Sequence, residues 1–477
     1  MSSFFSHYWP HIVLIASTGI GLAAAIHAAM TKDDVRAAIG WVGVIMLSPI
    51  LGALLYLVAG INRIRQTSAG RRRASQHRRR KHEQPPVAIA LSPSLSAMKR
   101  LGDYVGTFPL STGNAVQLLD SGDETYPQMI AAINAATRHV ALSSYIFDND
   151  PIGTAVADAL IAAHRRGVAV RVLIDAIGAR YSRPSIVGRL REGGVTTELF
   201  MGNLIGMRLP YANLRSHRKI LIVDGDLGFT GGMNIRAQFT SEFGADDPAR
   251  DTHFRLEGPA VEQLLTVFCQ DWAFTCGEEL EGPAWAEAPA GPPRGPVAVR
   301  VVPSGPDHNL ANAHNMIMGA LSIAQNSVHI CSPYFLPDQQ LIGALTIAGR
   351  RGVEVDVVIP SANNLKLVDH AMTAQLDQVL VGECRVWRAR GMFDHSKLMA
   401  VDGCWAYVGS SNLDPRSLRL NFELDLELYD PAIARQVEAR IKAMVGSGSA
   451  ETLARLKSLS FLQRLRNRAI WLASPYL

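Results

Sequence analysis

The segment HRRGVAVRVLID at residues 164–175 returns in a similar form as GRRGVEVDVVIP at residues 349–360. Each copy follows an apolar run, HVALSSYIFDND at 139–150 and SVHICSPYFLPD at 327–338, with a helical segment between them. β-Branched runs after glycine are typical of strands, and the order strand, helix, strand indicates α/β units on a largely parallel sheet. The chain therefore contains an internal repeat, which predicts an α/β fold with two similar lobes.

A second doubled feature follows later in each copy, SHRKILIVDG at 216–225 and DHSKLMAVDG at 394–403. In both, a Lys follows the His by two positions, so the two side chains share one face of a strand. The Asp that precedes the glycine has the opposite parity and begins a turn, which favours a structural role for it. The candidate catalytic residues are His217, Lys219, Asp224, His395, Lys397 and Asp402.

A His and a Lys on one face suit an anionic phosphate. The Lys charge stabilises developing negative charge, and an imidazole can attack phosphorus or carry a proton near neutral pH. One His cannot do both in a single step, whereas two copies that face each other can divide the work. Each His is followed seventeen residues later by an Asn, Asn234 in GGMN and Asn412 in GSSN. These amides are the predicted substrate-binding donors.

Two uncharged apolar runs precede the repeat, at residues 12–30 and 37–61. Each is long enough to cross a bilayer as a helix. Such runs also occur as buried core helices or, near the start of a chain, as signal peptides. Residues 1–11 contain no Lys or Arg, however, and a signal peptide normally carries basic residues there. The two runs therefore predict an N-terminal two-helix transmembrane hairpin.

A basic run follows the hairpin, with nine Lys and Arg and no acidic residue between Arg63 and Lys81. Basic juxtamembrane segments stay on the cytoplasmic side, so the body and the short N-terminus are both expected there. Without these nine, the 42 Asp and Glu outnumber what remains of the 47 Lys and Arg. A folded face that binds nucleic acid is usually basic, so no nucleic-acid partner is expected. The run instead suits anionic membrane lipids.

The domain organisation follows from these features. Residues 1–61 are the predicted hairpin, 62–113 a basic linker, 114–295 the first lobe, 296–445 the second lobe and 446–477 a C-terminal amphipathic tail. The tail mixes apolar and basic residues at helical spacing. It is expected to lie on the membrane surface or to pack against the body, and the sequence does not choose between these two.

The doubled pattern His-x-Lys-x4-Asp, each followed by Gly-x-x-Asn, resembles the phospholipase D superfamily. Longer strings, such as LRSHRKILIVDGDLGFTGGMN at 214–234 and RDTHFRLEGPAV at 250–261, are similar to bacterial cardiolipin synthases of the membrane-hairpin type. The resemblance implies phosphatidyl transfer between two phosphatidylglycerol molecules, with release of glycerol, at the bacterial inner membrane. It also implies a phosphatidyl-histidine intermediate and no metal or other cofactor.

The resemblance assigns roles to the site residues as well. His217 would be the nucleophile and His395 the general acid and then base, although the sequence leaves that order open. The Lys and Asn residues of both copies would clamp the phosphate. Each copy would also hold a carboxylate that orients its imidazole. Glu423 in NFELDL fits this role in the second copy, and Asp251 is the looser counterpart in the first.

Other activities share these motifs. A phospholipase D hydrolase, or a phosphatidyltransferase with another acceptor, would use the same intermediate, because water or another hydroxyl can attack it. A membrane-anchored phosphodiesterase acting on nucleic acid is a third hypothesis, in which RRRASQHRRRK at 71–81 would hold the nucleic acid. The acidic balance of the body argues against it.

Overall fold

The computed structural model describes residues 2–32, 35–60, 90–202, 214–243, 248–282, 284–285, 293–307 and 309–474. The basic run at 63–81 lies outside these residues. The described chain forms two units, an N-terminal helical unit and an α/β body. Each unit is described by itself.

The N-terminal unit contains α1 (Ser2–Thr31), α2 (Val35–Leu47), α3 (Pro49–Leu55) and the π-helix η1 (Tyr56–Gly60). Within α1, the 24 residues Tyr8–Thr31 are long and apolar enough to cross a membrane. The expectation of a second continuous span over 37–61 is wrong, because the helix breaks at Ser48 and restarts at Pro49. Proline has no N–H to continue a helix but fits the first position of a new one.

The second apolar run folds back on itself. Gly52 of α3 lies so close to α2 that a Cβ there would come within 2.7 Å of the Ile45 Cα. The hydroxyl of Tyr56 hydrogen-bonds with His27 Nδ1 at 2.8 Å and with Thr31 Oγ1 at 3.1 Å. Lys32 Nζ also donates to the carbonyl oxygen of Gly60. The run thus returns to the C-terminal end of α1, the end from which it started.

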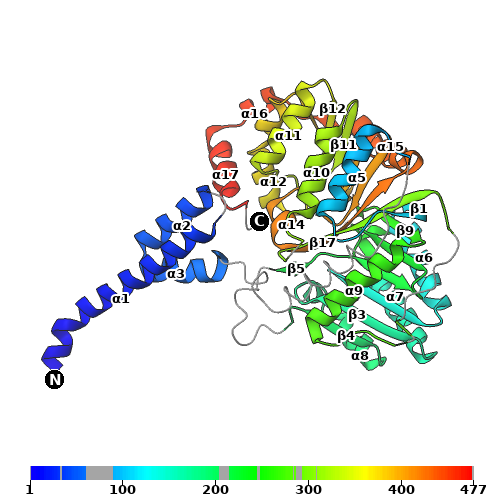
Figure 1. The fold of residues 1–477 in the computed structure, drawn as a ribbon, viewed down its shortest axis with the longest axis horizontal. Helices are drawn as coiled ribbons and strands as arrows, with labels where there is room; N and C mark the ends of the chain where they lie inside the picture. The colour runs from blue at the N-terminus through cyan, green and yellow to red at the C-terminus, as the bar shows by residue number, and fades with distance from the viewer. Residues whose placement is uncertain are drawn as a thin grey trace. The chain divides into compact units, whose positions relative to one another are not determined.

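The body is built on one sixteen-stranded sheet in which two lobes repeat the same order (Figure 1). The first lobe runs β4-β3-β2-β6-β7-β9-β1 and the second runs β13-β12-β11-β15-β16-β17-β10. The antiparallel pair of β1 and β10 joins them. The first set is β1 (Ser111–Leu119), β2 (His139–Ser144), β3 (Ala169–Asp175), β4 (Thr196–Phe200), β6 (Ile220–Val223), β7 (Leu227–Gly231) and β9 (His253–Glu257). The second is β10 (Val297–Ser304), β11 (Ser327–Cys331), β12 (Glu354–Pro360), β13 (Arg385–Ala389), β15 (Leu398–Val401), β16 (Trp405–Gly409) and β17 (Asn421–Tyr429), with β18 (Ser449–Ala450) beyond β13.

Helices cover both lobes, and each lobe has its own apolar core. In the first lobe they are α6 (Gly122–Ala135), α7 (Pro151–Arg165), α8 (Ile186–Glu192) and α9 (Ala260–Cys276). In the second they are α10 (Asn312–Ile323), α11 (Gln339–Arg350), α12 (Lys366–Thr373), α13 (Leu376–Leu380), α14 (Pro415–Arg419) and α15 (Pro431–Ser447), followed by α16 (Leu453–Ser458) and α17 (Phe461–Trp471). Helices on both faces explain why strands such as β6 and β15 read as unbroken apolar runs.

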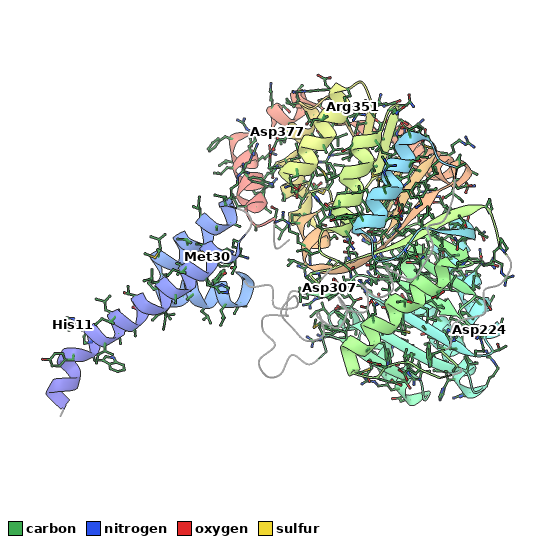
Figure 2. All side chains as sticks on the ribbon, viewed as in Figure 1. His11, Met30, Asp224, Asp307, Arg351 and Asp377 are labelled. Atoms are coloured by element: carbon green, nitrogen blue, oxygen red, sulfur yellow. The ribbon has the colours of Figure 1, made fainter. Side chains whose placement is uncertain are left out.

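The RRGV repeat ends a helix in each lobe. Gly167 and Gly352 adopt φ values of 90° and 87°, which glycine reaches without strain, and turn the chain from helix into strand. Arg166 donates to the carbonyl oxygens of Ile133 and Ala136 at the end of α6. Arg351, which is labelled in Figure 2, donates in the same way to the carbonyl oxygens of Ser322 and Ala324 at the end of α10. These four-residue segments thus tie neighbouring helices together.

The predicted linker over 62–113 is partly folded, which corrects that expectation. Helix α5 (Pro93–Val105) is capped by Ser92, whose side chain accepts a hydrogen bond from Leu95 N, and it buries Leu95 and Met98 in the core of the second lobe. Asp103 of α5 pairs with the buried Arg300 of β10 at 2.5 Å. The apolar spacing of this helix was present in the sequence, but the neighbouring polar composition concealed it.

The contact between α5 and Arg300 leaves no room for a side chain at Gly102. A Cβ there would lie 1.3 Å from Nη1 of Arg300, which is fully buried and also pairs with Glu427. We therefore expect Gly102→Ala to lower the melting temperature of the detergent-solubilised protein, because overpacking costs about 1–3 kcal/mol. The matched control is Gly188→Ala in α8, where a Cβ meets nothing within 4 Å. Alanine there should be neutral or stabilising by up to about 1 kcal/mol, and equal effects at the two positions would contradict this packing.

Candidate active site

Two short pairs of parallel strands, here called ribbons, each join one strand from each lobe, and the motif histidines follow them directly. Strand β5 (Arg215–Ser216) pairs with the start of β17, and β14 (Phe393–Asp394) pairs with β8 (Ala249–Arg250). His217 follows β5 directly, and its N–H donates to Phe422 O at 2.8 Å. His395 follows β14, and its N–H donates to Arg250 O at 2.7 Å. Each ribbon therefore fixes one motif His against the other lobe.

The same ribbons place a carboxylate beside each imidazole. His217 Nδ1 lies 3.2 Å from Glu423 Oε1, and His395 Nδ1 lies 2.8 Å from Asp251 Oδ2. Both carboxylates are fully buried. The sequence analysis assigned each carboxylate to the His of its own copy, and the structure exchanges them across the lobes. With Nδ1 engaged, Nε2 is the nitrogen left for chemistry on each ring.

Both motif lysines are buried beside their histidines. Lys219 Nζ donates to His217 O at 2.5 Å, and Lys397 Nζ donates to His395 O and lies 2.9 Å from His395 Nδ1. An imidazole Nδ1 carries either a proton or a lone pair, so it can serve Asp251 or Lys397 but not both at once. A proton on Nδ1 favours the carboxylate, and a lone pair there favours the ammonium.

Burial sets the charge state of this cluster. It lowers the pKa of His217 to about 4, with Glu423 opposing the shift and Lys219 adding to it. Burial, Lys397 and Lys219 together hold the pKa of His395 well below its usual value. Burial also lowers the pKa of Lys219 to about 8 and raises the pKa of Asp251 to about 7. Neutral imidazoles beside two cationic lysines make a site that favours an anion, and a bound anion would raise the pKa of both imidazoles.

The motif aspartates bind backbone rather than either His. Asp224 accepts hydrogen bonds from the N–H groups of Thr137, Arg138 and His139 at 2.7–2.9 Å. Partial burial opposes this effect, but these donors hold the pKa of Asp224 below its usual value. Asp224 also lies away from the middle of the body (Figure 2). Asp402 accepts from the N–H groups of residues 325–327 in the same pattern. Each Asp clamps the chain just before the first central strand of its lobe.

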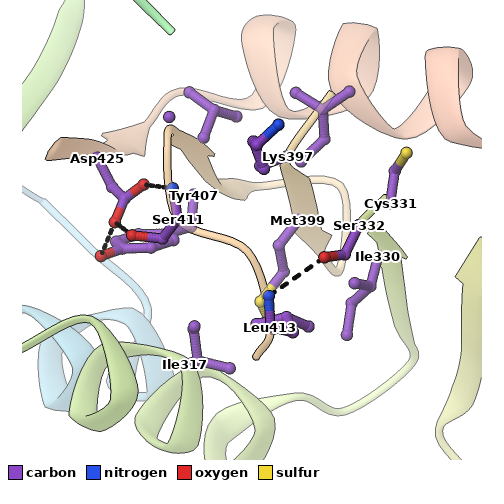
Figure 3. Close-up of a pocket in the computed structure, with 13 residues that line it drawn as sticks. Ile317, Ile330, Cys331, Ser332, Lys397, Met399, Tyr407, Ser411, Leu413 and Asp425 are labelled. Atoms are coloured by element: carbon purple, nitrogen blue, oxygen red, sulfur yellow. Dashed lines mark hydrogen bonds between the residues drawn. The ribbon is translucent and has the colours of Figure 1, made fainter. Parts of the chain in front are cut away.

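The predicted substrate amides lie in two buried turns. Asn234 Oδ1 accepts from Ile146 N at 3.1 Å, and Asn412 Nδ2 donates to Ser417 Oγ at 3.4 Å. Next to Asn412, Ser410 Oγ donates to Glu423 Oε2 at 2.7 Å and so helps hold the carboxylate that faces His217. Ser411 donates to Asp425 through both its N–H and its hydroxyl (Figure 3).

A cavity of about 20 Å³ lies beside this turn, lined among others by Lys397, Ser411 and Asp425 (Figure 3). That volume holds about one water molecule and no lipid headgroup. The cavity is therefore a packing feature behind the site rather than the substrate cleft.

Two aromatic residues that the sequence analysis did not single out lie against the histidines. The ring of Tyr145 is 4.5 Å from that of His217, and the ring of Tyr334 is 5.9 Å from that of His395. They lie one position apart in the repeat, because Ser144 Oγ donates to Ile146 O in the first copy and Ser332 Oγ donates to Tyr334 O in the second. An aromatic residue close to the same strand end in both copies was the signal that would have found them.

Arg218, between the motif His and Lys of the first copy, was also missed. It points away from them and is buried, donating to Asp271 at 2.6 and 2.7 Å and to Glu423 O at 3.0 Å. The second copy has Ser396 instead, which bonds with Thr252 at 2.9 Å. Both residues attach a motif segment to the rest of the sheet, by different chemistry.

No cofactor or metal was expected from the sequence. In the part of the chain that the structure describes, no group of three or more His, Cys, Asp or Glu side chains could hold a metal ion.

Solved structures give the first comparison. The crystal structure of phosphatidylserine synthase from Haemophilus influenzae Rd KW20 superposes on 80% of this chain and on all of its own, with a TM-score of 0.60 at 17% identity. At that identity the likeness concerns the fold alone. The two-lobed sheet and the doubled His-x-Lys site together define an enzyme of the phospholipase D superfamily.

Sequence comparisons show which family of this superfamily the chain resembles. A family model described as "Cardiolipin synthase, PLD-like domain" matches residues 129–272 and 317–445, and one described as "Phospholipase_D-nuclease N-terminal" matches 19–60. Cardiolipin synthase A of Pseudomonas aeruginosa is 32% identical over 98% of this chain and 96% of the relative. A cardiolipin synthase of Geobacillus kaustophilus is 32% identical over 82% and 79%. The chain belongs to the cardiolipin synthase family.

Asp224 binds backbone N–H groups and contacts neither motif histidine, so its role is structural. We expect Asp224→Asn to lower the free energy of unfolding by about 1–3 kcal/mol, because an amide presents donors to N–H groups that need an acceptor. The folded variant should keep its activity. Because the folded pKa of Asp224 is lowered, the stability that this group contributes is present above about pH 4 and lost as the pH falls further. Thermal unfolding and activity of the folded fraction, measured together, check this, and a stable but inactive Asp224→Asn would contradict it.

Proposed function

We propose that this protein transfers a phosphatidyl group from one phosphatidylglycerol to another, giving cardiolipin and glycerol through a phosphatidyl-histidine. The main support is the exchanged pairing of His217 with Glu423 and of His395 with Asp251. It supplies two imidazoles, each oriented through Nδ1, beside two buried lysines. Membership of the cardiolipin synthase family makes the phosphodiester of a phospholipid the natural substrate.

In the first step Nε2 of neutral His217 attacks the phosphorus of the donor lipid. The bond from phosphorus to the glycerol headgroup oxygen breaks, and the Nε2–H of protonated His395 gives that oxygen its proton. We assign the attack to His217 by the resemblance, since burial lowers the pKa of both imidazoles and so does not distinguish them. His395 gains its proton once the anionic phosphate is bound, with Asp251 stabilising the imidazolium through Nδ1.

In the second step His395, now neutral, removes the proton from a primary hydroxyl of the second phosphatidylglycerol. The resulting oxygen attacks the phosphorus, the bond to His217 breaks, and cardiolipin leaves. Lys219 and Lys397 neutralise charge on the phosphate oxygens throughout. The side-chain amides of Asn234 and Asn412 serve as additional hydrogen-bond donors to the phosphate oxygens.

Water could attack the same intermediate, which would make phosphatidic acid. We favour transfer because the relatives that cover most of the chain are named cardiolipin synthases. A nucleic-acid substrate is disfavoured, since outside the basic run acidic residues outnumber basic ones.

The assay is purified protein incubated with phosphatidylglycerol as the only lipid, followed by mass spectrometry of lipids and glycerol. We expect cardiolipin and glycerol in equal amounts. His217→Ala and His395→Ala should each reduce turnover by at least about a thousandfold. The matched control is His164→Ala, which replaces an exposed histidine at the end of α7 and should leave turnover unchanged.

Each alternative has its own outcome in this assay. Phosphatidic acid in place of cardiolipin would identify a hydrolase, and wild-type turnover in either histidine variant would refute the two-histidine mechanism. Peptide mapping after a rapid denaturing quench at neutral pH, which spares the acid-labile bond from phosphorus to nitrogen, should locate the phosphatidyl group on His217. Finding it on His395 would reverse the assigned order and keep the mechanism.

For the membrane arrangement, we infer that α1 crosses the bilayer once and that α2 and α3 form a re-entrant pair. The support is the contact of Lys32 with Gly60, by which the chain leaves the unit at the end where α1 ends. The basic run at 63–81 follows directly and favours the cytoplasmic side. The body is then cytoplasmic, as expected from the sequence, whereas the N-terminus lies on the opposite side.

Thiol labelling of oriented membrane vesicles tests this topology. In a Cys276→Ser background, cysteines replace Ser3 and Ala90 one at a time, and a membrane-impermeant reagent is added to right-side-out vesicles. We expect residue 3 to react at once and residue 90 only after lysis. Protection of both residues until lysis would instead support two full spans.

A further inference from the structure

The C-terminal helix α17 presents an apolar face to the outside of the body. Four of its residues or near neighbours are more than half exposed, namely Phe461 at 68%, Leu462 at 73%, Leu465 at 53% and Leu472 at 76%. Positions 461, 465 and 472 follow helical spacing, and 462 lies beside them, so the four share one face. A soluble surface helix normally turns such a face inward.

The opposite face of α17 is already used. Asn467 is buried, and Ile470 and Trp471 pack against the core of the second lobe. Arg466 Nη2 lies 3.4 Å from His370 Nδ1 of α12, the helix that α17 packs against (Figure 1). The capping box formed by Ser460 and Gln463 fixes where the helix begins. The outward apolar face is therefore held in place by a folded helix, and is not a frayed end.

Arginines border the apolar face on both sides. Arg464 and Arg468 flank one edge and Arg466 flanks the other, and all three are exposed. Arg468 forms a salt bridge with Asp377 at 3.1 Å, and both side chains are exposed. An apolar stripe with arginines at its edges is the pattern of a helix that lies in the plane of a bilayer surface, with its cations among anionic headgroups.

Two more exposed leucines, Leu365 and Leu367, lie at the start of α12, the helix that α17 packs against. The residue before them, Asn364, accepts a hydrogen bond from the hydroxyl of Tyr334 at 2.9 Å. The Tyr334 ring in turn contacts His395. One short chain of contacts thus connects the apolar surface with a motif histidine.

We propose that the outward face of α17, together with Leu365 and Leu367 of α12, docks on a bilayer surface that contains anionic lipid. The helix enters the headgroup layer with its leucines and Phe461, and its arginines pair with lipid phosphates. Docking there sets the His395 side of the site next to the lipid surface, so a phospholipid reaches it without crossing water.

A fluorescent depth probe on the full chain tests the proposal without relying on turnover. In a Cys276→Ser background, an environment-sensitive dye is attached to a cysteine at Leu462. The control places the same dye at Glu192, an exposed residue at the end of α8. Both proteins are reconstituted in vesicles of phosphatidylcholine with phosphatidylserine, an anionic lipid other than the proposed donor, and in vesicles of phosphatidylcholine alone.

With phosphatidylserine present, the dye at residue 462 should shift to shorter wavelengths and lose most of its emission to a quencher attached to the lipid chains. The dye at residue 192 should do neither. Equal behaviour of the two dyes would overturn the proposal. A shift at 462 without lipid quenching would also overturn it, because the face would then be covered by protein, whether the N-terminal helices or a second copy.

The role of charge is tested separately. The triple variant Arg464→Gln, Arg466→Gln and Arg468→Gln should lose most of the lipid quenching at residue 462, while its melting temperature stays near that of the parent. Equal quenching in the variant, or in phosphatidylcholine alone, would overturn the anionic part of the proposal. Because no readout uses catalysis, failure of the proposed transfer reaction would leave these results unaffected.

Discussion

The exchange of carboxylates between the lobes is the constraint on which the site depends. Glu423 orients His217 and Asp251 orients His395, each across the boundary between the two copies. The main chain enforces the exchange, since each motif histidine donates its N–H to the residue immediately before the other copy's carboxylate. Neither lobe holds a complete site, so the internal repeat is a requirement of the chemistry rather than a remnant of duplication.

Burial of this paired site determines the charge of its histidines. Two lysines and two imidazoles are withdrawn from water together, and the imidazoles respond by giving up their protons. Lys219 and Lys397 then supply the positive charge of the site, opposed by the carboxylates that orient the imidazoles. A bound phosphodiester adds negative charge and raises the pKa of the imidazoles, so that one of them can hold the proton that it later donates.

The sequence predicted the repeat, the two lobes and the identity of the motif residues, because these depend on local periodicity and on spacing. It also indicated the structural role of Asp224, whose parity on the strand differs from that of His217. It did not predict which carboxylate faces which histidine, because β5 and β14 are two-residue strands whose partners are far away in the chain. Helix α5 was missed beside a polar segment, and the break at Pro49 was missed because hydropathy alone records no fold-back.

The strand pair β1 and β10 makes the two lobes one continuous sheet, and the two ribbons add main-chain bonds on either side of the site. A hinge that separated the lobes would have to break these hydrogen bonds together. The two lobes of the body therefore move together as one rigid unit. Substrate exchange at the site has to occur without separating the lobes.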